Sequence, residues 1–98
     1  MINSEFLRNL NACDEGYASF AAKFPSNASY KQIFTVMEKE HCIWLIVALA
    51  RNNECPSEIL ELIPIQYSKE TRRNFYRYLV ANWASIKPAL LSIKLDSL

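Results

Sequence analysis

One histidine and three cysteines are the residues of this chain best suited to nucleophilic or metal chemistry. His41 directly precedes Cys42, whereas Cys13 and Cys55 lie far from that pair in the sequence. A catalytic thiol needs a base within hydrogen-bonding reach. Neighbouring residues on a helix point roughly 100° apart, so His41 and Cys42 do not face each other. We therefore predict no catalytic thiol, although folding could bring His41 to Cys13 or Cys55.

The chain also lacks the usual patterns of metal, cofactor and acid–base sites. Zinc ligands usually occur in closely spaced pairs, and no C-x-x-C pair is present. None of the carboxylates lies in an apolar stretch that would raise its pKa for acid–base catalysis. Gly16 is the only glycine, which argues against Gly-rich phosphate loops and hairpin-rich β folds. We predict no enzymatic activity, no metal and no cofactor.

Charge is distributed unevenly along the chain. Residues 1–40 carry four basic and five acidic groups, residues 41–64 carry one and three, and residues 65–98 carry six and two. Three of the last basic residues recur every fourth position and form a stripe along a predicted helix over 69–83. Aromatic rings are expected beside the stripe, partly exposed. The predicted partner-binding residues are Lys69, Arg72, Arg73, Tyr76, Arg77 and Trp83.

This basic and aromatic surface has three interpretations. It could be a solvated helix face, with its aromatic rings packed beneath the following helix. It could bind a protein, because Arg, Tyr and Trp are enriched in interface hot spots. It could instead bind nucleic acid through phosphate contacts and base stacking. The isoelectric point of about 7.7 is below the value of about 9 typical of nucleic-acid-binding domains.

Helices are predicted throughout. Ser4 is expected to cap a helix ending near Asn11, and Ser29 a helix with Ile33, Val36 and Met37 inward. A break between two helices is expected at 85–88, because the residue before Pro88 resists the α conformation. The other predicted helices cover about 14–24, 40–51, 56–63 and 69–83 (capped by Ser68), with a last one from Pro88 through Leu95.

The predicted fold is a compact all-α bundle of about six short helices in a single domain, 1–98. The helix over 40–51 is apolar on all sides, which places it at the centre. The longest apolar run, 42–50, is shorter than the roughly 20 residues of a membrane helix. No secretory leader is evident, and an odd number of cysteines suits free thiols in a reducing compartment. We expect a cytoplasmic protein that does not enter a membrane.

Two segments resemble known families. Ala50-Arg51-Asn52, followed by Cys55-Pro56-x-Glu58-x-Leu60, resembles the leucine-rich repeat variant consensus, with a degenerate copy at 78–91. This resemblance implies a protein-binding scaffold and two stacked helical hairpins in the C-terminal half. Ala12-Cys13, Ser29 and Trp44-Leu45 resemble small uncharacterised helical proteins of bacteriophages and mobile elements. That resemblance implies a phage context.

The leading functional hypothesis is therefore a non-catalytic protein that binds another protein. A phage origin would make it an inhibitor of a host enzyme or defence complex. The alternative is a nucleic-acid-binding accessory protein that uses the basic helix 69–83. A homodimer that joins the acidic middle of one copy to the basic end of the other is a further alternative.

Overall fold

The computed structural model describes residues 2–64, 66 and 71–93. Its elements are helices, and the one β pairing within the described residues is an isolated antiparallel bridge between Ile2 and Ala28. The predicted all-α bundle is thus confirmed. The helices are α1 (Ser4–Asn9), α2 (Asp14–Lys23), α3 (Tyr30–Val36), α4 (Lys39–Arg51), α5 (Ser57–Leu60) and α7 (Arg72–Ser92).

Side-chain caps explain where several helices begin. Asn3, rather than the predicted Ser4, caps α1, and its Oδ1 accepts a hydrogen bond from the Phe6 N–H at 2.9 Å. Ser29 caps α3 as predicted. Its hydroxyl accepts from the Gln32 N–H, and the Gln32 side chain accepts from the Ser29 N–H. Such a capping box satisfies two donors that the first turn of a helix leaves unpaired.

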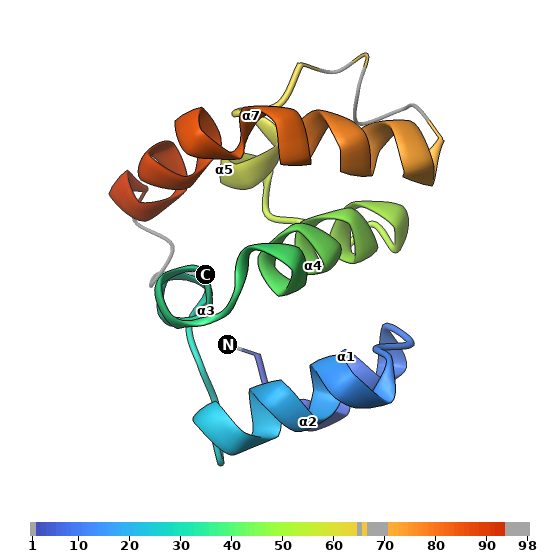
Figure 1. Cartoon of the computed structure of the whole chain (residues 1–98), viewed down its shortest axis with the longest axis vertical. Coiled ribbons are helices and arrows are strands. Elements are labelled where there is room, and N and C mark those ends of the chain that lie inside the picture. Colours follow the sequence, from blue (N-terminus) through green and yellow to red (C-terminus); the bar gives the residue numbers. More distant parts are fainter. Residues whose placement is uncertain (1, 65, 67–70, 94–98) are drawn as a thin grey trace.

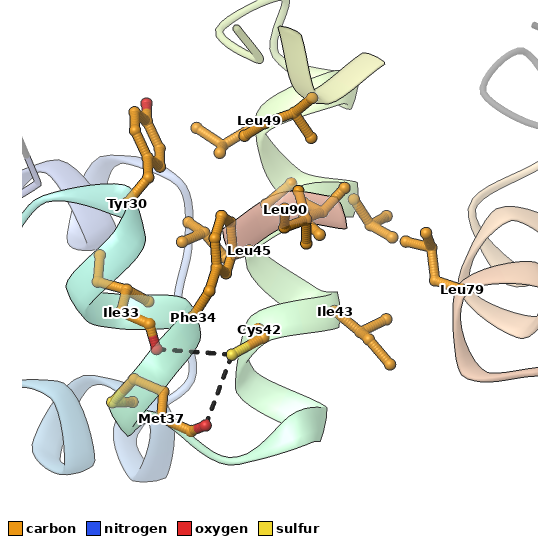
Figure 2. Packing of buried hydrophobic residues seen from close by; sticks show 14 of the residues in the cluster. Tyr30, Ile33, Phe34, Met37, Cys42, Ile43, Leu45, Leu49, Leu79 and Leu90 are labelled. Atoms are coloured by element: carbon orange, nitrogen blue, oxygen red, sulfur yellow. Dashed lines mark hydrogen bonds between the residues drawn. The ribbon is translucent and has the colours of Figure 1, made fainter. Parts of the chain in front are cut away.

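α4 lies at the centre of the fold, as predicted. In Figure 1 it runs between the α1–α2 pair on one side and α7 on the other. Figure 2 shows side chains of α3 and α7 pointing toward α4, among them Phe34, Leu79 and Leu90. A helix with neighbours on several sides requires apolar residues around most of its circumference. The buried residues of α4 are Cys42, Ile43, Leu45, Ile46, Val47, Ala48 and Leu49.

The predicted break at 85–88 is wrong, because α7 continues through Pro88 to Ser92. Proline removes one backbone hydrogen bond and crowds the preceding turn. Burial on both sides of the proline offsets that cost, since Ile86 and Leu90 are both buried. One helix therefore replaces the two predicted here. The second predicted hairpin, at 78–91, does not form.

α3 requires a second correction. Val36 was expected to point inward, yet 49% of it is exposed. Tyr30, Ile33, Phe34 and Met37 are buried instead. Their spacing of three, four and seven residues forms one helical face, and Val36 lies off that face.

Some predictions fall outside the described residues, namely the cap at Ser68, the stripe residue Lys69 and the chain end from Lys94 through Leu95. No helix in the described ranges is both long enough and apolar enough to cross a membrane.

Candidate partner-binding surface

The start of α7 places its basic residues in solvent. Thr71 caps the helix, and its hydroxyl accepts a hydrogen bond from the Asn74 N–H at 3.3 Å. Phe75 and Leu79 are fully buried and fix the rotation of the helix against the core. This rotation leaves Arg72, Arg73, Arg77 and Val80 exposed.

These exposed residues form one continuous surface, which we call the α7 basic face. A shallow hollow on α7 is lined by Arg72, Arg73, Tyr76, Arg77, Val80 and Ala81. Tyr76 is half-buried, and 39% of Val80 is exposed. Across the part of the chain that the structure describes, none of the three arginines forms an ion pair or side-chain hydrogen bond. The α7 basic face therefore presents three uncompensated positive charges around a small apolar centre.

Trp83 does not belong to this surface, which corrects the sequence-based prediction. Only 7% of its surface is exposed. If the helix ended near Trp83, its apolar face would be centred close to Phe75, and Trp83 would lie at the margin of that face. The observed helix is longer and also buries Ile86 and Leu90. At roughly 100° per residue, these two residues shift the centre of the apolar face toward Trp83, which is therefore buried. The apolar spacing beyond Pro88 was the signal that could have revealed this.

Two of the three thiols are withdrawn from solvent, since Cys42 is buried in the core and Cys55 is half-buried against it. The Cys42 thiol lies 3.6 Å from the Met37 carbonyl oxygen and 3.7 Å from that of Ile33, and it donates to these oxygens (Figure 2). Burial raises the pKa of Cys42 to about 11 and that of Cys55 to about 12. Since the thiolate is the nucleophilic form, neither side chain is suited to nucleophilic attack near neutral pH.

The fold does bring Cys13 and His41 near each other, which their sequence spacing did not indicate. Both line a largely apolar cavity of about 40 Å³ beside Gly16. A Cβ atom on Gly16 would lie 3.5 Å from the Cys13 sulfur and 3.9 Å from His41 Cδ2. His41 therefore turns a carbon toward this point. Its Nδ1 atom is buried and has no hydrogen-bond partner among the described residues.

In this arrangement the Cys13 thiol is engaged by the backbone of its own helix. Cys13 is exposed, and its sulfur accepts a hydrogen bond from the Gly16 N–H at 3.4 Å, as a helix cap. It makes no hydrogen bond with His41 in the structure. Within the described ranges, no three His, Cys, Asp or Glu side chains gather as metal ligands would.

Comparison with protein-family models, curated proteins and solved structures finds no match to this chain. The two resemblances given above therefore remain predictions, and the function must be argued from the surface itself.

Proposed function

We propose that the protein acts without catalysis, by binding an acidic surface of another protein through the α7 basic face. The observation that supports this proposal is the set of three exposed arginines on one helix, none of which has a counter-charge among the described residues. Unpaired positive charge attracts an acidic partner and speeds its association. Tyr76 and Val80 offer apolar contacts at the centre of the face, which would slow dissociation.

A protein partner suits this face better than nucleic acid does. Single-stranded nucleic acids are commonly held by bases stacked on exposed aromatic rings. Trp83 is buried, so Tyr76 is the one predicted ring that retains an accessible edge. The small net charge of +1 also provides little long-range attraction for a polyanion.

In biological terms, we propose a small inhibitor that occupies a functional surface of its target. The resemblance to phage proteins supports a host enzyme or defence complex as that target. The segment similar to leucine-rich repeat variants supports a binding role more generally.

The proposal can be tested by pull-down from host lysate with three tagged forms of the full chain. These are the wild type, an Arg73→Glu/Arg77→Glu variant, and a Lys31→Glu/Lys39→Glu control with the same change in net charge. Lys31 and Lys39 are exposed on other helices. We expect the wild type and the control to capture the same protein and the α7 variant to lose it. Equal capture by all three forms would refute the proposal.

A salt titration separates the nucleic-acid alternative. Three phosphate contacts would give a slope of about −3 in a plot of log affinity against log salt for duplex DNA. We expect no saturable binding of duplex or single-stranded oligonucleotides at physiological salt. Saturable binding with that slope, lost in the Arg73→Glu/Arg77→Glu variant, would favour the nucleic-acid function. Sedimentation of the purified chain at increasing concentration tests the homodimer.

A further inference from the structure

A second basic site lies at the edge of the α7 basic face. In Figure 1 the turn after α1, the end of α4 and the start of α7 lie on the same side of the molecule. A hollow in this region is lined by Leu10, Asn11, Ala48, Arg51, Asn52 and Arg72. Arg51 occupies the last turn of α4 and Arg72 the first turn of α7. Two arginines that are 21 positions apart in the sequence thus line one hollow.

Among the described residues, none compensates the charge in this hollow. No carboxylate occurs among its described lining residues. Arg51 and Arg72 are exposed, and neither makes an ion pair or a side-chain hydrogen bond in the described structure. The first turn of α7 contains no acidic residue. A helix N-terminus carries partial positive charge, so a cation there is unfavourable for folding unless an anion is bound nearby.

We infer that this hollow binds a phosphoryl group, carried by a phosphorylated side chain of the protein partner. This inference rests on the proposed function, since Arg72 belongs both to the hollow and to the α7 basic face. Guanidinium groups present forks of N–H donors that match phosphate oxygens. The exposed amide of Asn11 lies at the same hollow and provides a further donor.

Charge balance favours a phosphate monoester over the other anions. A phosphorylated side chain carries about −1.5 to −2 at neutral pH, which matches two guanidinium groups. A carboxylate, or one phosphate of a nucleic-acid backbone, carries a single negative charge and would leave one arginine uncompensated. The site is also a single hollow with two arginines, whereas a backbone with regularly repeated charges requires an extended track of cations.

Phosphate binding can be measured directly by nuclear magnetic resonance on the full chain. Inorganic phosphate would be titrated into the wild type, Arg51→Gln and Arg72→Gln, with acetate and chloride compared at matched ionic strength. Lys31→Gln serves as the control, because Lys31 is exposed on a different helix. We expect saturable shifts centred on Arg51 and Arg72. Each arginine variant should weaken phosphate binding about three- to tenfold, and the control should not change it.

Other outcomes would overturn the inference. Chloride shifts equal to those of phosphate would show only general screening. Stronger binding of acetate than of phosphate would show a carboxylate site. Unchanged phosphate affinity in Arg51→Gln would show that the two guanidinium groups do not act together.

Two further measurements separate this inference from the proposed function. Arg51 lies outside the α7 basic face, so Arg51→Gln tests the hollow alone. We expect phosphatase treatment of the lysate and Arg51→Gln to weaken partner capture similarly. Capture unaffected by both changes would reject the phosphoryl site and leave the proposed function standing. Specific phosphate binding, together with normal capture by Arg73→Glu/Arg77→Glu, would reject the proposed function and leave phosphate binding at the hollow standing.

Discussion

α4 and α7 use apolar residues in opposite ways. α4 buries nearly every residue from Cys42 to Leu49, with Trp44 half-buried, so its middle has almost no solvent face and only its ends are exposed. α7 buries one residue in every three or four, and the residues between them are half-buried or exposed. The enclosed middle of α4 can contribute little beyond stability, whereas its exposed last turn places Arg51 at the hollow shared with Arg72. A two-sided helix can stabilise the fold with one face and present charge with the other.

The comparison also shows where function can change without loss of the fold. Substitutions between Cys42 and Leu49 of α4 affect packing at almost every position, because these residues are buried in a close-packed core. Substitutions at Arg73, Arg77 or Val80 remove no core contact, since these residues are exposed. The candidate surface is therefore built on the part of the molecule most tolerant of sequence change.

The largest predicted effect is on the buried faces of both helices. Ile46→Ala in α4 and Leu79→Ala in α7 each remove a side chain with no solvent exposure. Each should lower the free energy of unfolding by about 2–5 kcal/mol, through lost burial and the cavity left behind. Denaturant unfolding followed by circular dichroism measures this loss. A cost below about 1 kcal/mol for Leu79→Ala would mean that α7 is not packed on α4 as described.

Pro88→Ala should raise the free energy of unfolding, whereas the two core substitutions lower it. Pro88 is exposed within α7, and proline in a helix interior is about 3 kcal/mol less favourable than alanine. Water can solvate the carbonyl that proline leaves unpaired, which reduces this penalty in the native protein. We therefore expect the free energy of unfolding to rise by about 1–3 kcal/mol. Thermal unfolding of the variant beside the wild type measures the gain. Ala89→Gly is a control that should lower stability, and a loss of stability in Pro88→Ala would contradict a continuous helix.

The sequence predicted most of this fold because its signals were local. The Ser29 cap, the proline after α2 and the apolar run of α4 each act within a few residues. The predicted end of the helix at Trp83 was wrong, because the tendency of Pro88 to end a helix was given more weight than the apolar spacing that continues to Leu90. The prediction that Trp83 points toward solvent followed from that error. The approach of Cys13 to His41, and of Arg51 to Arg72, depends on tertiary packing and has no local signal.

A smaller effect is expected at the start of α7. Thr71→Ala removes the hydroxyl that accepts the Asn74 N–H and should cost about 1 kcal/mol. Ser29→Ala at the α3 capping box should cost a similar amount. Urea unfolding of both variants measures how much each cap contributes to the free energy of unfolding. Because the α7 basic face begins at this turn, Thr71→Ala should also weaken partner binding, whereas Ser29→Ala should not. Equal effects of both variants on binding would argue against an ordered α7 start as part of the interface.

The smallest effect on stability is predicted for the one large apolar residue exposed on the α7 basic face. Val80→Ala should change the free energy of unfolding by less than about 0.5 kcal/mol, because 39% of Val80 is already exposed. Val36→Ala on α3 is the matched control, since Val36 is 49% exposed and lies outside the face. Partner binding should distinguish the two variants.

Loss of an interfacial valine side chain should weaken binding about three- to tenfold, because buried apolar area is lost in the complex. Val36→Ala should bind as the wild type does. Titration calorimetry with the captured partner measures both affinities. If Val80→Ala also binds as the wild type does, Val80 has no part in the contact, and Tyr76 is the remaining apolar residue at the centre of the α7 basic face. Weaker binding in Val36→Ala alone would move the interface to α3.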